Sequence, residues 1–182
     1  MKLYFIAILP DPGLRQRIKK IKEEVKELYN VKKAMKLPAH ITLQIPFKFP
    51  EEEEERLISS LASFAEDQKA FSVNLTGFGS FPPRVIFLKV ENEKPLQLLQ
   101  ERLQDVMKDF LLKDEDNKKK KAFHPHITVA TRDLDKETFK KAWNEFKKRD
   151  FEATFCAKIM VLFRHDGKNW NLHKEFLLKQ RF

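Results

Sequence analysis

Two tetrapeptides of the same pattern constrain what this chain can fold into. Residues 40–43 read His-Ile-Thr-Leu and residues 126–129 read His-Ile-Thr-Val, and each closely follows a proline. Alternating β-branched and apolar residues predict a strand, and residues i and i+2 of a strand point to the same face. Each tetrapeptide should therefore present a histidine and a threonine on one face and apolar side chains on the other. We expect Ile41, Leu43 and Ile45 to face a core, and the two polar faces to line a cleft.

The segments around the two tetrapeptides follow one order, which is strand, helix, His/Thr strand, helix and strand. The first pass is predicted at residues 3–9, 14–28, 40–47, 51–64 and 71–75, and the second at 85–88, 96–110, 126–129, 135–146 and 151–157. This order predicts an internal duplication about a pseudo-two-fold axis, with repeats at approximately 1–80 and 84–163 and a last strand at 168–178. The repeats could exchange strands, so lobes in space need not follow repeats in sequence.

These elements predict the fold class and the domain organisation. We expect one bilobal α+β domain over residues 1–182, with two mixed or antiparallel sheets flanked by helices around a central cleft. The glutamates at 51–55 are expected to be a solvated helix start, because acidic residues suit the positive end of a helix dipole. The lone cysteine, Cys156, excludes an internal disulfide and is expected to be a small buried strand residue.

Charge and hydropathy limit the class of partner. The chain has 36 Lys and Arg against 27 Asp and Glu, a formal net charge of +9, which favours polyanionic partners such as nucleic acid. It has no signal-peptide pattern and no stretch that approaches about 18 apolar residues, the length that a membrane span needs. We therefore expect a cytoplasmic monomer that does not interact with membranes.

The paired motifs suit chemistry at phosphorus. Imidazole titrates near neutral pH, so one histidine can act as a base while the other acts as an acid. The two threonine hydroxyls can donate hydrogen bonds to non-bridging phosphate oxygens. A lone His-x-Thr is common by chance and usually structural, but two in matching places of a duplicated pattern favour function. If the histidines carry both proton transfers, no metal and no cofactor is required.

These motifs resemble the 2H phosphoesterase superfamily, which includes the 2′-5′ RNA ligase-like and cyclic phosphodiesterase proteins. Residues 1–8 resemble its first strand, residues 83–87 its arginine-led strand, and residues 40–43 and 124–129 its two motifs. The resemblance implies a metal-independent phosphodiesterase acting on 2′,3′-cyclic phosphates or 2′-5′ phosphodiesters, often at RNA ends. It also implies catalytic roles for His40, Thr42, His126 and Thr128. In family mechanisms the second histidine often activates water and the first protonates the leaving oxygen, although nothing in the sequence breaks the symmetry between His40 and His126.

Other residues are weaker candidates. Arg84, Arg132, His124 and Tyr4 could bind the substrate, the arginines at a phosphate or base, His124 at the rim, and Tyr4 by stacking on a base. The run Lys118–Lys121 is expected to be a solvated loop, and its place before the second motif also suits an RNA backbone contact. His165 and His173 lie outside both motifs and are expected to be structural or exposed.

Two rival hypotheses come from other classes. An RNA- or nucleotide-phosphate-binding module would hold phosphates in the same cleft without turnover, and it would not need a titratable pair. A two-histidine metal site is weaker, because no Cys, Asp or Glu stands at ligand spacing from either histidine. RNA, tRNA fragments, a small cyclic phosphate and a nucleotide-derived metabolite all suit the predicted site, with or without ligation.

Overall fold

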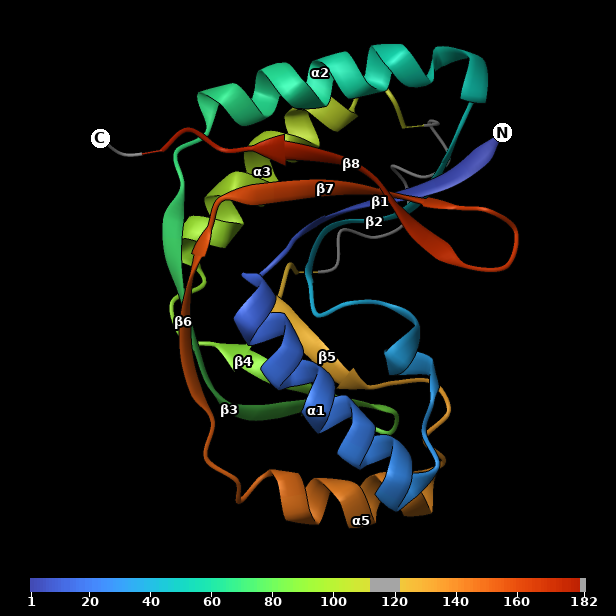
Figure 1. The fold of residues 1–182 in the computed structure, drawn as a ribbon, viewed down its shortest axis with the longest axis vertical. Coiled ribbons are helices and arrows are strands. Elements are labelled where there is room, and N and C mark those ends of the chain that lie inside the picture. Colours follow the sequence, from blue (N-terminus) through green and yellow to red (C-terminus); the bar gives the residue numbers. More distant parts are fainter. Residues whose placement is uncertain (112–121, 181–182) are drawn as a thin grey trace.

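Two antiparallel sheets of four strands each organise the chain, in a computed structural model that describes residues 1–111 and 122–180 (Figure 1). The first sheet has the strand order β2-β1-β7-β8 and the second has the order β5-β4-β3-β6. The strands are β1 (Lys2–Ile8), β2 (Ile41–Phe49), β3 (Phe71–Phe81), β4 (Val85–Val90), β5 (His126–Ala130), β6 (Glu152–Ala157), β7 (Ile159–His165) and β8 (Trp170–Leu177). The helices are α1 (Pro12–Tyr29), α2 (Glu54–Asp67), α3 (Lys94–Met107) and α5 (Lys136–Phe146), with 3-10 turns η1 (Lys33–Lys36) and η2 (Glu51–Glu53). The predicted α+β class is confirmed, and every strand pair in both sheets is antiparallel.

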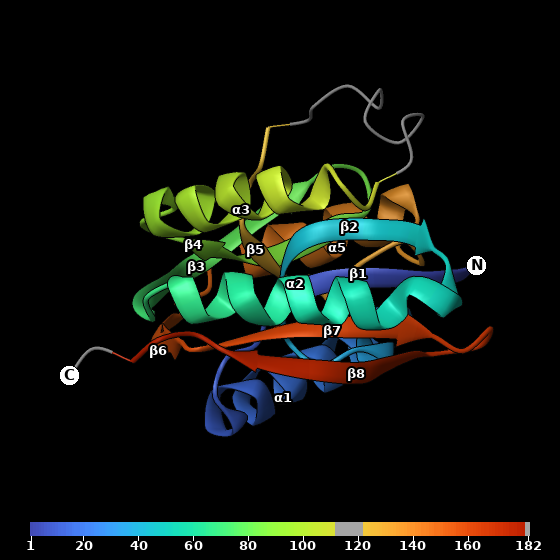
Figure 2. The same ribbon diagram turned by 90° about the horizontal axis from the view of Figure 1, so that it is seen from above.

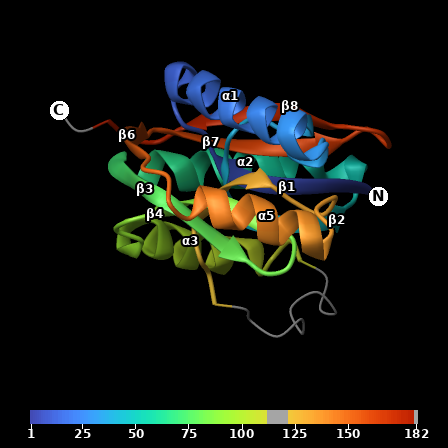
Figure 3. The same ribbon diagram turned by 90° about the horizontal axis from the view of Figure 1, so that it is seen from below.

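Each lobe contains strands from both halves of the chain. In the first sheet β1 pairs with β2 on one side and on the other with β7, which comes from the C-terminal end and pairs in turn with β8. In the second sheet β3, from the N-terminal half, pairs with β4 and β6. Helices α2 and α3 lie together over the first sheet (Figure 2), and α1 and α5 lie together beside the second (Figure 3). Helix α1, which follows β1, therefore packs near β5, and α3, which follows β4, packs near β2. Among the described residues, no helix is long and apolar enough to cross a membrane.

Irregular pairing of β2 with β1 changes which side chains are buried. Tyr4 pairs with Phe47, Ile6 with Gln44 and Ala7 with Thr42, so β2 carries one extra residue on each side of Gln44. An extra residue in one strand reverses the alternation of its side chains, and a second one restores it. As a result Gln44 is buried and Ile45 is 63% exposed, so the prediction that Ile45 faces the core is wrong. The Gln44 amide oxygen accepts a hydrogen bond of 2.7 Å from Gln104 of α3, which satisfies this buried polar group.

Three further expectations need correction. Cys156 lies on β6 as expected but is exposed, because its side chain points away from the core that Phe155 and Ala157 enter. The spacing of Leu14, Ile18, Ile21, Val25 and Leu28 predicts one buried stripe on the helix at 14–28. Leu28 is nevertheless 57% exposed, since it lies in the last turn of α1 at the margin of this stripe. Glu51, Glu52 and Glu53 are exposed as expected, but Glu54 is not a solvated carboxylate: its side chain is only 14% exposed and bonds to three neighbours.

Candidate active site

Local backbone structure holds the His40 ring in one orientation. His40 directly precedes β2, and its Nδ1 lies 2.8 Å from the carbonyl oxygen of Pro38. Because a carbonyl oxygen can only accept, Nδ1 carries the hydrogen and donates it. In the neutral ring Nε2 then has a free lone pair and can accept a proton, and in the charged ring it can deliver one.

His126 repeats this arrangement at the start of β5. Its Nδ1 donates to the carbonyl oxygen of His124 over 2.6 Å, again two residues upstream. Both histidines therefore use the same nitrogen, Nδ1, to bond the backbone and leave the same nitrogen, Nε2, for other contacts. Strands β2 and β5 are neighbours across the two lobes, and the charge on His126 acts on the pKa of His40, so the structure brings the two motifs together.

An aromatic cluster packs against each histidine. The His40 ring lies 5.4 Å from Phe5 and 6.1 Å from Phe163, measured between ring centroids. Phe5 and Phe163 stack face to face at 4.5 Å, and Trp170 meets Phe5 edge-on at 4.7 Å. These contacts hold the His40 ring from the side of β1 and β7. We did not predict this cluster, because the sequence has 17 phenylalanines and nothing in it distinguishes Phe5 and Phe163 as lying outside the main core.

The aromatic neighbours of His126 come from β3 and β4. Its ring centroid lies 4.8 Å from that of Phe87 and 5.1 Å from that of Phe81. The Phe87 ring lies over Gly79 of β3, where a Cβ atom would come within 2.5 Å of the ring. Only glycine leaves room for Phe87 in this place, so Gly79 indirectly supports the position of His126.

Sheet pairing places both threonines beside their histidines. Thr42 pairs with Ala7, and Thr128 pairs with Phe87, two strand positions on from the pair of His126 and Lys89 and therefore on the same face. Directly opposite residues of an antiparallel pair share a face. Lys89 therefore lies on the His126 face as an additional cation, which we did not predict, although the alternation of exposed Lys89 with buried Leu88 and Val90 could have indicated it.

Burial sets the protonation state of both histidines. It lowers the pKa of His40 to about 4, and the positive charges of Lys22 and His126 act in the same direction. Burial also lowers the pKa of His126, but there the nearby Glu93 carboxylate acts in the opposite direction. Both rings are therefore neutral at pH 7 in the free protein, with Nδ1 protonated and Nε2 unprotonated.

Three of the four weaker candidates are exposed, and the fourth, Tyr4, is buried. Arg84, Arg132 and His124 are all exposed, and His124 lies near the site, with its ring 6.4 Å from that of Phe81. Arg84 follows the cis Pro82-Pro83 bond, and Arg132 adopts a left-handed conformation with φ of 50° just after β5. The Lys118–Lys121 run lies outside the described residues.

Tyr4 does not belong to the site. It is fully buried on the face of β1 opposite to Phe5, and its hydroxyl donates to Glu54 over 2.6 Å. Its predicted role in stacking on a base is therefore wrong, because alternation along β1 sends residues 4 and 5 to opposite faces. His173 lies beside the same carboxylate, with its Nε2 at 3.0 Å from Glu54. His165 accepts a hydrogen bond from the Gly167 amide. Both histidines therefore make contacts that support the fold, away from the two motifs.

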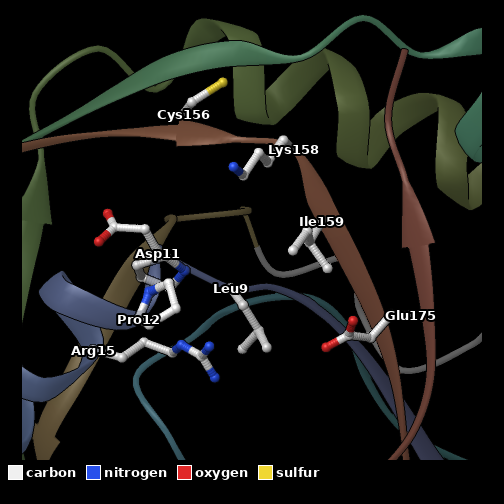
Figure 4. A pocket seen from close by; sticks show the side chains of 9 residues that line it. Leu9, Asp11, Pro12, Arg15, Cys156, Lys158, Ile159 and Glu175 are labelled. Carbon is white, nitrogen blue, oxygen red and sulfur yellow. The ribbon is translucent and has the colours of Figure 1, made fainter. Parts of the chain in front are cut away.

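Two cavities lie beside helix α1. One cavity of about 180 Å³ lies at the start of α1, lined by Arg15 of α1, Glu175 of β8 and Lys158, which lies between β6 and β7 (Figure 4). A second, of about 400 Å³, lies between α1 and residues 35–39. Neither of these two cavities is lined by a histidine or threonine of the two motifs.

Two His/Thr strands carried by two four-stranded antiparallel sheets define the two-histidine class of phosphoesterases. The chain belongs to the 2′-5′ RNA ligase superfamily, whose family model matches residues 10–169. A Bacillus cytotoxicus protein named "Putative phosphoesterase" is 32% identical over 146 residues, which cover 78% of this chain and 80% of the relative.

Solved structures share the fold over the whole chain. A protein from Thermus thermophilus superimposes with a TM-score of 0.73 at 25% identity and full coverage of both chains. Escherichia coli LigT complexed with 3′-AMP superimposes with a TM-score of 0.65 at 18% identity, over 98% of this chain and 99% of that chain. At 18% identity, the likeness to LigT is evidence for a shared fold alone.

Proposed function

We propose that this phosphoesterase hydrolyses 2′,3′-cyclic phosphate or 2′-5′ phosphodiester bonds, at RNA ends or in small nucleotides, by two-histidine acid/base catalysis without a metal. The matched tautomers carry this proposal: His40 and His126 each fix Nδ1 on a carbonyl oxygen and leave Nε2 for proton transfer. A pair of identical groups on two facing lobes suits in-line displacement, which removes a proton on one side of phosphorus and delivers one on the other.

The reaction balances with water as the only co-substrate. One Nε2 takes a proton from water as its oxygen forms a bond to phosphorus. The bond from phosphorus to the ribose oxygen breaks, and the second Nε2 gives a proton to that oxygen. Because both rings are neutral at pH 7 in the free protein, the second Nε2 must first take this proton from solvent. Thr42 and Thr128 donate hydrogen bonds to the non-bridging oxygens, and Lys89, on the His126 face, offsets the phosphate charge.

The flanking aromatic residues favour a nucleotide over a small inorganic ester. Phe81, which is 39% exposed beside His126, is placed to contact a base or ribose of the bound nucleotide. In support, LigT, which shares the fold, has been solved with 3′-AMP.

The second candidate function is an RNA- or nucleotide-phosphate-binding module without turnover. Binding alone would be better served by permanent cations than by two histidines that are neutral at pH 7. The two fixed tautomers therefore favour catalysis over binding.

A substrate panel separates these functions. We expect the protein to open a 2′,3′-cyclic nucleotide or cleave a 2′-5′ linked dinucleotide in the presence of excess EDTA, and to leave a 3′,5′-cyclic nucleotide intact. Binding of the first two without product would favour the binding module. Loss of turnover with EDTA, restored by one divalent ion, would exclude the metal-free mechanism.

A further inference from the structure

Helix α1 places a buried lysine beside the turn that carries His40. Lys22 is only 4% exposed, although its neighbours Glu23 and Lys19 are on the surface of the same helix. Its Nζ donates to the carbonyl oxygens of Ala34 and Leu37, each at 3.0 Å. A lysine is rarely buried unless it is paired with an acid, so its role requires an explanation.

The two carbonyls bonded to Lys22 belong to the segment that ends in the His40 contact. Ala34 lies in η1, Leu37 ends it, and the next residue, Pro38, supplies the oxygen that fixes Nδ1 of His40. Lys22 therefore holds this turn at two points immediately before the carbonyl that orients the imidazole. Movement of the turn would move the oxygen that sets the tautomer of His40.

The surroundings of Lys22 leave its charge without a compensating acid. Lys22 lines the groove of about 400 Å³ together with Arg15, Lys19 and Lys36, and none of the described residues that line this groove is acidic. Burial lowers the pKa of Lys22 to about 8, so the amine is still mostly charged at pH 7. The positive charge of Lys22 lowers the pKa of His40, because it opposes protonation of the ring.

We propose that Lys22 is a positioning residue for His40, which fixes the turn that carries the imidazole and places an unneutralised positive charge near it. The proposal rests on the proposed function for its catalytic meaning. Besides burial, the groups that act on the pKa of His40 are the Pro38 carbonyl, which raises it, and Lys22 from α1 and His126 from β5, which lower it. The rings of Phe5 from β1 and Phe163 from β7 pack beside His40 and carry no charge.

Lys22 breaks the symmetry between the two histidines. His40 has a cation as its charged neighbour, whereas His126 has the carboxylate of Glu93 in addition to His124. The two rings therefore share one tautomer but differ in the charged groups around them.

An NMR titration of the imidazole protons tests the proposal without substrate. In Lys22→Met we expect the pKa of His40 to rise by about one unit, because a nearby like charge has been removed, while that of His126 stays the same. Lys22→Gln, which keeps a donor for one carbonyl, should raise the pKa of His40 in the same direction and covers the case in which the methionine variant does not fold. Lys20→Met, on the exposed side of the same helix, is the matched control and should leave both titrations unchanged.

Turnover gives the second readout. In a folded Lys22→Gln protein the pH dependence of kcat/KM should move to higher pH, together with the His40 titration. If turnover or thermal stability falls while the pKa of His40 stays at the wild-type value, Lys22 only supports the fold and the proposal is overturned. Because the titration needs no substrate, failure to hydrolyse any phosphodiester would count against the proposed function and not against this inference.

Discussion

At the scale of single residues, the two histidines should act as one unit. His40→Ala and His126→Ala should each lower kcat by about 10² to 10⁴-fold, the usual contribution of general acid or base catalysis. The double variant should be far less impaired than the product of the singles, because removing either partner already stops the paired proton transfers. Thr42→Ala and Thr128→Ala should each cost about 10 to 100-fold, since each loses one hydrogen bond to a charged phosphate.

His173→Ala is the control for these substitutions. Its ring contacts Glu54 and Tyr4 on the opposite face of the first sheet, so the variant should lose thermal stability and keep its kcat. A folded His40→Ala or His126→Ala protein with wild-type turnover on a substrate of the parent enzyme would contradict the paired mechanism.

The pH dependence of kcat/KM also belongs to these two residues. This quantity reports the free enzyme, in which burial lowers the pKa of both histidines from 6.5. One ring must be neutral and the other charged, so the rate should pass through a maximum between two apparent pKa values that both lie on the acidic side of that value. A profile of kcat/KM that rises steadily from pH 6 to pH 9 would show that a different base is at work.

At the scale of elements, the close approach of β3 and β4 supports the second motif. In Gly79→Ala the new Cβ would lie within 2.5 Å of the Phe87 ring, so the ring must move and lose its contact with His126. We expect the free energy of unfolding to fall by about 1 to 3 kcal/mol, the usual cost of overpacking, together with a loss of kcat/KM.

A double variant checks that the Phe87 ring is the cause. Adding Phe87→Ala to Gly79→Ala removes the clash, so the two substitutions together should destabilise less than the sum of their separate effects. Strict additivity in urea unfolding would show that the alanine at position 79 acts on the backbone and not through Phe87.

Sequence periodicity predicted the elements well and their partners poorly. The two His/Thr strands and their apolar faces followed from alternation. The prediction for Ile45 was wrong, because no residue pattern within β2 indicates where its pairing with β1 becomes irregular. Tyr4 and Phe5 are adjacent aromatics on one strand, and only the sheet decides which of them faces His40. The role of Lys22 depends on its contacts with a turn 12 to 15 residues further along the chain. The sequence of the helix does not indicate which of its many lysines makes such contacts.

At the scale of the whole molecule, exchange of elements ties the lobes together. The side chain of Asp133, just after β5, accepts hydrogen bonds from the backbone amides of Lys32 and Lys33, at 2.6 and 2.9 Å. The loop after the second motif therefore holds the segment that leads into the first. Because strands and helices cross between lobes and loops bond across them, we expect one cooperative unfolding transition that involves both sites.

That cooperativity makes the protonation of His40 visible in global stability. The pKa of His40 is about 4 in the folded protein and near 6.5 in the unfolded chain, so between these values the unfolded chain binds a proton that the folded one does not. Stability must then fall as the pH drops from 6.5 towards 4, by up to about 3 kcal/mol. Carboxylates such as Asp166, whose pKa is lowered to about 2, lose their contribution mainly below this window.

The contribution of His40 can be isolated by comparison with His40→Gln, which has no titratable ring at this position. Urea unfolding of both proteins at pH 7.5, 6, 5 and 4.5 should give a shallower loss of stability for the variant, with His126 and the carboxylates titrating equally in both. If the two curves run parallel from pH 7.5 to 4.5, the folded protein binds the proton on His40 as readily as the unfolded chain does. The ring would then be positively charged at pH 5, and it could not serve there as the base that accepts a proton from water.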